Sequence, residues 1–319
     1  MLDNSMKVIP VDASNEKNFD IVQSKCNEVY SSKIWSSAYT TGLKRFAIQA
    51  DNGDIIGGWA AYERKKWGLK ILITPPFASH CGLFFLSDKK NPSGIHTDVK
   101  KCMEAIASFL ISSSYHYFKI EFPPEFHDFQ SFIWKGVSVS TRYTYLLSLN
   151  SSIDDLEAAF DPKLRNKITK GKNAGFEVSI EKDANTAHKL FTLNLQKKGI
   201  SWNDEILTGL MQLPEMKNAV ISENGRPSAV AMICGQNEKC YYLFGSTDKG
   251  NSNNSSGPMA LYHAILLAKS SGFSLFDFEG SMLPEVEQFF RQFGGKLTPV
   301  YSIKGGRGLW PRLISLYLK

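Results

Sequence analysis

Residues 274–303 read SLFDFEGSMLPEVEQFFRQFGGKLTPVYSI, and this stretch decides the fold class. Residues 274–278 form a short run rich in apolar and aromatic side chains, which predicts a strand. Pro284 suits the first position of a helix, and the apolar pattern after it predicts a helix that ends at the glycine pair 294–295. Residues 298–303 predict a further strand. Strand, helix and strand in this order are typical of a sheet covered by helices.

The residues before this stretch extend the same unit. Residues 240–244 (CYYLF) predict a strand, and residues 248–257 form a loop rich in Asn, Ser and Gly. Residues 259–270 follow as a helix, because Leu261, Ile265 and Ala268 recur on one stripe.

The first half of the chain repeats this order. Its expected elements are a strand at 70–75, a helix at 96–113, a strand at 117–122, a short helix at 126–134 and a strand at 141–149. Matching positions keep a nearly constant offset: Phe122 and Phe278 are 156 residues apart, Gly136 and Gly294 are 158 apart, and Tyr145 and Tyr301 are 156 apart. The pattern predicts duplication of one supersecondary unit.

Each half also has a hairpin upstream of these elements. Strands at 44–50 and 55–63 flank the turn at 51–54, and strands at 219–222 and 227–234 flank Glu223-Asn224-Gly225. Asn-Gly between alternating apolar runs is a strong hairpin signal. Each half therefore reads as helix, hairpin, strand, helix, strand, helix and strand. We expect two domains, residues 1–150 and 151–319, each a mixed, mostly antiparallel sheet flanked by helices.

Composition limits the function classes. The 319 residues are 43% hydrophobic and 21% charged, which is typical of a globular protein. No run of about 18 apolar residues is present, and the first residues show no secretory signal. Five scattered cysteines without metal-ligand spacing favour a reducing compartment. We expect a cytoplasmic protein without a metal, and the net charge of +6 favours an anionic ligand.

Three segments carry a resemblance to a known family: 164–175 (LRNKITKGKNAG), 275–281 (LFDFEGS) and 286–295 (VEQFFRQFGG). Together with the element order they resemble the GNAT acyltransferase fold. Two such units in tandem resemble the Fem family of peptidoglycan-bridge aminoacyltransferases and the GNAT-domain proteins of polysaccharide gene clusters. The resemblance implies an acyltransferase whose site lies in the second half. The first half, where Phe122-Pro123-Pro124 stands in place of the Asp-Phe-Glu-Gly turn, is expected to be degenerate and to help form the acceptor cleft.

The loop before the helix at 259–270 is the expected donor site. Backbone N–H groups at a helix N-terminus bind anions, and in GNAT enzymes this place holds the pyrophosphate of coenzyme A. In this loop, the nearest match to the family's sequence signature for pyrophosphate binding departs from that signature at its first and last positions. The alternative is a surface loop that caps a helix. The cofactor-binding candidates are Tyr242, Ser246, Asn254, Ser256 and Gly257.

Asp277 and Glu279 are the catalytic candidates, at the end of a predicted strand where α/β sheets usually place ligand contacts. A carboxylate there can accept the proton that an attacking amine loses. Alternation predicts that both face the same side, with Phe276 and Phe278 buried behind them. The alternative is that one carboxylate caps the following turn or pairs with Arg291.

The substrate-binding candidates are mostly cations. Several positive side chains on a helix suit a phosphate or carboxylate on the substrate, although a solvated helix face is the alternative. Trp202 is a candidate for lining an acceptor pocket, with packing as its alternative, and Ser281 shapes the turn after Glu279. The full set is Arg165, Lys167, Lys170, Trp202, Ser281 and Arg291.

The sequence therefore favours an N-acyltransferase that moves an acyl group from an acyl-CoA thioester to the amine of a small molecule or glycan precursor of the cell envelope or a polysaccharide. Two alternatives stay open. One uses aminoacyl-tRNA as the donor, as in the Fem family, and only this one requires a nucleic acid. The other is a non-catalytic double domain that binds a ligand or a partner.

Overall fold

A computed structural model describes residues 6–181, 184–248, 255–280, 282–308 and 310–311. The chain forms two compact units: unit 1 contains residues 1–142 and 299–319, and unit 2 contains residues 143–298. None of the helices in the described part of the chain is long and apolar enough to cross a lipid bilayer.

Unit 1 is a sheet with strand order β1-β2-β3-β4-β6-β13, and β5 pairs with β3. Its strands are β1 (Lys7–Pro10), β2 (Leu43–Gln49), β3 (Ile55–Lys66), β4 (Leu69–Ile73), β5 (Phe84–Phe85), β6 (Tyr117–Glu121) and β13 (Lys296–Gly305), the last from residue 299 onward. Its helices are α1 (Glu16–Gln23), α2 (Lys33–Ser37), α3 (Pro92–Ser112) and α4 (Gln130–Trp134).

The long helix α3 begins where the sequence supplies a cap. The Asn91 side chain accepts a hydrogen bond from the Gly94 N–H at 2.7 Å, and Pro92 occupies the first turn. Its buried stripe, which includes Met103 and Ile106, packs into the main core of unit 1. The helix is therefore held by burial of one apolar face.

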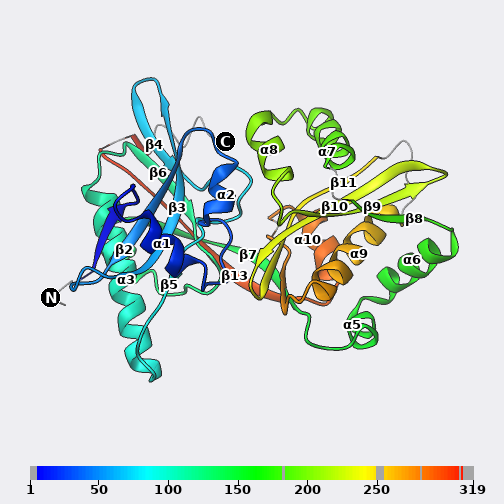
Figure 1. Cartoon of the computed structure of the whole chain (residues 1–319), viewed down its shortest axis with the longest axis horizontal. Helices are drawn as coiled ribbons and strands as arrows, with labels where there is room; N and C mark the ends of the chain where they lie inside the picture. Colours follow the sequence, from blue (N-terminus) through cyan, green and yellow to red (C-terminus); the bar gives the residue numbers. More distant parts are fainter. Residues whose placement is uncertain (1–5, 182–183, 249–254, 281, 309, 312–319) are drawn as a thin grey trace. The chain divides into compact units, whose positions relative to one another are not determined.

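Unit 2 is a sheet with strand order β7-β12-β11-β10-β9-β8. Its strands are β7 (Ser138–Ser148), from residue 143 onward, β8 (Glu177–Glu181), β9 (Lys217–Glu223), β10 (Arg226–Gln236), β11 (Lys239–Thr247) and β12 (Leu275–Asp277). Its helices are α5 (Ile153–Ala159), α6 (Pro162–Asn173), α7 (Asn185–Lys197), α8 (Asp204–Met211), α9 (Ser256–Ser270) and α10 (Pro284–Arg291). Figure 1 shows α7 and α9 on opposite faces of this sheet.

The expected repeat is present in the topology. In unit 1 the strands β4 and β6 pair in parallel through Ile71 and Tyr117, with α3 between them in sequence. In unit 2 the strands β11 and β12 pair in parallel through Lys239 and Leu275, with α9 between them. All other strand pairs with a described register are antiparallel. The predicted fold class, two mixed, mostly antiparallel sheets flanked by helices, is confirmed.

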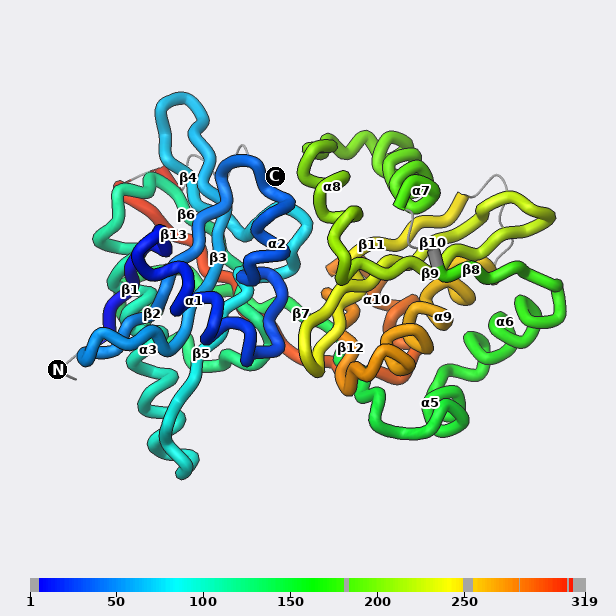
Figure 2. Tube along the Cα trace, in the orientation of Figure 1, coloured from blue at the N-terminus to red at the C-terminus, as the bar shows by residue number. Residues whose placement is uncertain are grey.

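The last strand of the first sequence half pairs with a strand of unit 2, and the last strand of the second half pairs with a strand of unit 1. The end of β7 pairs with β12, with Ser148 opposite Leu275, and β13 pairs with β6, with Ser302 opposite Glu121. Figure 2 shows the consequence by colour, since the red end of the chain runs among the blue and cyan strands of unit 1. Alternation predicts that a segment is a strand but carries no information on its partner. The assignment of residues 1–150 and 151–319 to separate domains stays a prediction.

Candidate functional site

A β-bulge interrupts β11 next to the expected donor loop. Tyr242 lies opposite Ile233 of β10, but Phe244 lies opposite the adjacent Met232, so Leu243 is the extra residue. Such a residue reverses the side-chain alternation. Accordingly, the Tyr242 ring packs on Phe290 of α10 at 5.7 Å, whereas the Phe244 ring packs on Phe191 of α7 at 4.8 Å. The backbone here leaves the regular ladder.

The turn that follows β12 begins close to the position along β11 where the bulge begins. The parallel pairing of β11 and β12 ends at Tyr241 and Asp277. On β11 the bulge begins one residue after Tyr241. On the neighbouring segment Glu279 lies two residues after Asp277. The two strands therefore stop pairing where both features occur.

Asp277 is buried, with 1% of its surface exposed. Its Oδ1 accepts hydrogen bonds from the Thr144 hydroxyl at 2.6 Å and from the Glu279 N–H at 2.9 Å. Its Oδ2 lies 3.4 Å from the buried Nζ of Lys239. Asp277 therefore caps the turn, which was the alternative interpretation of one of the two carboxylates.

Glu279 is half-buried and adopts a left-handed backbone conformation with φ of +61°. Phe276 and Phe278 are buried behind the turn, as expected. However, β12 ends at Asp277, so Glu279 lies outside the strand. That the two carboxylates face the same side stays a prediction. Gly280 follows at φ +72°, and a Cβ there would lie 2.3 Å from the Tyr143 carbonyl oxygen. The predicted Ser281 lies outside the described residues.

A negatively charged side chain lies next to the start of α9. The hydroxyl of the buried Ser256 donates a hydrogen bond to the carboxylate of Glu223 at the end of β9. A Cβ on Gly257 would lie 3.1 Å from the Thr247 hydroxyl, so the first turn of α9 packs against the end of β11. A carboxylate at a helix N-terminus is stabilising, and it would repel a phosphate bound there. The predicted Asn254 lies outside the described residues.

The two other donor-site candidates differ in their environment. The Ser246 hydroxyl is buried and donates to the Leu190 carbonyl at 2.7 Å, which ties α7 to β11. Burial raises the pKa of the Tyr242 phenol above its usual value, so this phenol is protonated at neutral pH. A Cβ on Gly245 would overlap the Tyr242 hydroxyl oxygen.

A cationic pocket of about 580 Å³ joins α6 to α10. It contains Lys167 and Arg291, which were predicted separately, together with Lys163 from the first turn of α6. Among the lining residues that the structure describes, Asp161 contributes a carboxylate, and Gln288 and Gln292 contribute amides. The backbone of Asp161 donates to the Gln292 carbonyl at 2.8 Å and fixes the two helices together.

The positive charge of this pocket is partly neutralised by a nearby carboxylate. Arg291 Nε lies 3.5 Å from Glu287 Oε1, and the same carboxylate oxygen accepts a hydrogen bond from the Tyr145 hydroxyl at 2.6 Å. Burial, and then Glu287, raises the pKa of Tyr145. The described lining residues include three cations and one carboxylate, so the pocket suits an anionic group.

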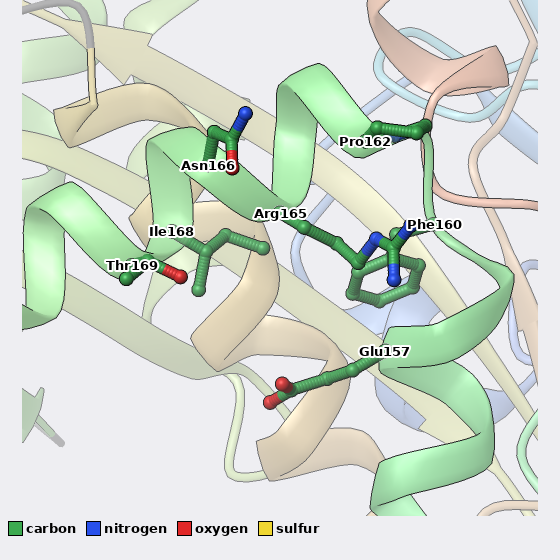
Figure 3. A pocket seen from close by; sticks show the side chains of 7 residues that line it. All are labelled: Glu157, Phe160, Pro162, Arg165, Asn166, Ile168 and Thr169. Atoms are coloured by element: carbon green, nitrogen blue, oxygen red, sulfur yellow. The ribbon is translucent and has the colours of Figure 1, made fainter.

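The remaining predicted cations lie elsewhere. Arg165 lines a second pocket of about 310 Å³ between α5 and α6, where its side chain extends toward the ring of Phe160 and lies above Glu157 (Figure 3). Lys170 is exposed and lies one turn beyond Lys167 on the same face of α6. The structure therefore brings Lys167 and Arg291 together and separates Arg165 from them.

Trp202 belongs to a polar cluster at the start of α8. Its indole N–H donates to Asp204 Oδ1 at 2.9 Å, and His188 Nε2 of α7 lies 3.0 Å from the same oxygen. This His–Asp pair is not among the residues that the sequence analysis selected. The two residues are 16 positions apart on different helices, and no local motif marks such a pair.

The fold can now be compared with known proteins. No protein-family model matches the sequence, and no curated protein matches it. Among solved structures, FemX superposes with a TM-score of 0.63 at 13% identity, covering 92% of this chain and 96% of FemX. A tandem GNAT protein from the clavulanic acid biosynthesis pathway superposes with a TM-score of 0.53 at 8% identity, covering 95% of this chain and 99% of that one. The chain has a tandem GNAT fold.

A third structure extends this likeness. The L-PGS structure from Bacillus licheniformis superposes on this chain with a TM-score of 0.57 at 12% identity, covering 96% of this chain and 96% of L-PGS. The same fold therefore accommodates sequences that share about one residue in eight with this one. Likeness at such identities establishes the fold, and the chemistry has to be argued from the site.

Proposed function

We propose that the chain is an N-acyltransferase that moves an acyl group from an acyl-CoA-type thioester to the amine of a small-molecule or glycan-precursor acceptor, such as a precursor of the cell envelope or a polysaccharide. One observation carries the proposal. The bulge at Leu243 and the strained turn at Glu279 occur together where β11 and β12 stop pairing. The bulged backbone leaves the ladder and supplies N–H groups for a carbonyl oxygen, and the turn supplies a carboxylate.

In the proposed reaction the acceptor nitrogen attacks the carbonyl carbon of the thioester. The C–N bond forms, the C–S bond breaks, and the thiolate leaves. Backbone N–H groups between Tyr242 and Ser246 polarise the carbonyl oxygen, as donors aimed at a developing oxyanion do. Glu279 accepts the proton that the nitrogen loses, and the protonated phenol of Tyr242 supplies a proton to the thiolate.

Asp277 takes a different role in this proposal. Because its carboxylate is buried and holds the Glu279 N–H, it positions the turn. The cationic pocket of Lys167 and Arg291 binds an anionic group of the acceptor. Phe290 and Arg291 are neighbours on α10, and Phe290 contacts Tyr242, so one helix borders both the proposed reaction centre and the anion pocket. Arg165, Lys170 and Trp202 stay predicted substrate contacts.

A second donor is favoured by the negative charge at the start of α9. Glu223 accepts a hydrogen bond from Ser256 at the place where coenzyme A phosphates are expected. Aminoacyl-tRNA delivers an ester carbonyl to the same bulge and does not require that phosphate site. The bond broken is then C–O, and the roles of Glu279 and the bulge are unchanged.

The first experiment is thermal unfolding of the purified protein with coenzyme A, acetyl-CoA and a longer acyl-CoA. A ligand at about 100 times its Kd adds roughly 2.7 kcal/mol of stability. We expect the melting temperature to rise with the thioesters, followed by acyl transfer when an amine acceptor is added. If none of the three raises it, aminoacyl-tRNA becomes the donor to test. If neither donor supports transfer, the chain is a ligand-binding double domain.

A further inference from the structure

The hairpin between β3 and β4 ends in an exposed tryptophan. Lys66 pairs with Leu69 across the hairpin, which leaves Trp67 and Gly68 as its two-residue loop. Their φ values are +52° and +76°. Positive φ at both loop positions defines the tight turn that favours Asn-Gly. Trp67 is 70% exposed.

The chain shows which residue this position prefers. In the β9–β10 hairpin the corresponding residue is Asn224, with φ of +52°, and the β10–β11 turn places Asn237 at the same φ. A bulky residue in this region is an outlier with a conformational cost. Because most of the Trp67 side chain is exposed, core burial does not offset that cost. A tryptophan here is therefore unfavourable for the turn itself.

The charges around the loop are unfavourable for the hairpin as well. Lys65 lies directly opposite Lys70, and like charges in that relation destabilise a strand pair. Lys66 places its Nζ 4.5 Å from the centre of the Trp67 ring. Between residues 55 and 73 the sequence contains a single carboxylate, Glu63, which accepts a hydrogen bond from Tyr115 at 2.9 Å. The tip therefore gathers three lysines and a tryptophan, and it attracts an anionic partner.

We propose that this hairpin tip docks unit 1 on an anionic lipid surface. Trp67 enters the headgroup region, where tryptophan is favoured, and Lys65, Lys66 and Lys70 contact lipid phosphates. Figure 2 shows the light-blue hairpin projecting beyond the rest of unit 1, so its tip can reach a flat surface. A single aromatic side chain with one ring face beside Lys66 fits an interfacial anchor better than a nucleic-acid groove, which uses several stacking platforms. The inference does not depend on the proposed acyl transfer.

The test uses the full chain and sedimentation with phosphatidylcholine vesicles, with and without phosphatidylglycerol. We expect binding only to the mixed vesicles, and we expect it to fall as salt rises. Trp67→Asn should weaken the binding roughly tenfold, by removing the buried aromatic surface. Each of Lys65→Gln and Lys66→Gln should weaken it about fivefold.

Trp134 is the matched control, since it is 68% exposed and has Lys100 Nζ 4.8 Å from its ring centre, but lies on helix α4. Trp134→Ala should leave vesicle binding unchanged. Trp67→Asn should also leave the melting temperature equal to or above that of the unmodified chain, because Asn suits the turn. Loss of binding without loss of stability is the result that a general folding defect does not produce.

Three results would overturn the proposal. The first is that the unmodified chain does not sediment with the mixed vesicles. The second is that Trp67→Asn and Trp134→Ala bind equally well. The third is that Trp67→Asn affects binding of a single-stranded oligouridine and not of vesicles, which would assign the tip to nucleic acid.

Discussion

The carboxylate of Asp277 accepts a hydrogen bond from the backbone N–H of Glu279 at 2.9 Å, so the buried acid holds the half-buried one in its strained turn. The two residues were indistinguishable as catalytic candidates in sequence. In the structure one is enclosed with Thr144 and Lys239, and the other follows the end of the strand. The pair therefore separates into a positioning acid and a proposed proton acceptor.

This separation predicts opposite phenotypes. Glu279→Gln should lower kcat by about 10²–10⁴-fold, the range for loss of a general base, with little change in melting temperature. Asp277→Asn keeps an oxygen for the Glu279 N–H but removes the charge beside Lys239. It should therefore destabilise the fold by about 3 kcal/mol, as for breaking a buried ion pair.

Steady-state kinetics and denaturant unfolding of both variants check this prediction. The assignment of roles is contradicted if Glu279→Gln retains full kcat or if Asp277→Asn is as stable as the unmodified protein.

The anion pocket predicts a charge-dependent effect on the acceptor. Lys167→Ala and Arg291→Ala should each raise the KM for an anionic acceptor about tenfold, because a charge-assisted hydrogen bond contributes roughly 1.5–3 kcal/mol. Both effects should shrink at high salt, since screening weakens the exposed charges. The pocket forms one site, so the double variant should lose less than the product of the single losses.

Lys189→Ala is the matched control for the pocket, because Lys189 is an exposed cation on α7 outside both pockets. Its KM should equal that of the unmodified enzyme. Equal effects of all three substitutions would show that only the overall charge matters.

Local signals in the sequence predicted most elements of the fold. Asn224 and Gly225 mark a hairpin, Pro284 begins α10 and Gly294 follows its end, each as expected from backbone preference. These signals work because φ preference and side-chain periodicity act within a few residues. The pairing of β7 with β12 lacks such a signal, because two alternating strands fit many partners equally well.

The candidate site was predictable to a smaller extent. Asp277 and Glu279 were found from their place at a strand end, but the Thr144 hydroxyl that holds Asp277 is 133 residues away. The bulge at Leu243 has no residue signature, because it is a mismatch in register between two strands. Lys167 and Arg291 were chosen separately, and only the packing of α6 against α10 shows that they share a pocket.

The carboxylate at the start of α9 distinguishes the two donors. If coenzyme A phosphates bind at this helix N-terminus, Glu223→Gln removes a repulsion and should tighten coenzyme A binding about tenfold. The same change removes a favourable helix-dipole interaction and should cost about 0.5 kcal/mol of stability. Titration calorimetry with coenzyme A measures the first effect, and thermal unfolding measures the second. Unchanged affinity together with reduced stability would place the phosphates elsewhere and favour the tRNA donor.

His263 predicts a pH dependence of stability. Burial, and then the charge of Lys172 on α6, lowers the pKa of His263 below its usual 6.5. The Tyr262 ring, 5.1 Å away, is the neighbouring aromatic group. The unfolded chain therefore binds a proton at a higher pH than the folded one, so the contribution of this histidine is complete above about pH 6.5 and declines as the pH falls. His263→Gln should make the melting temperature less sensitive to pH between about 6.5 and 5, whereas His127→Gln, at an exposed site, should keep the slope of the unmodified protein. A slope unchanged by His263→Gln would show that the imidazole is as easily protonated in the folded chain as in the unfolded one.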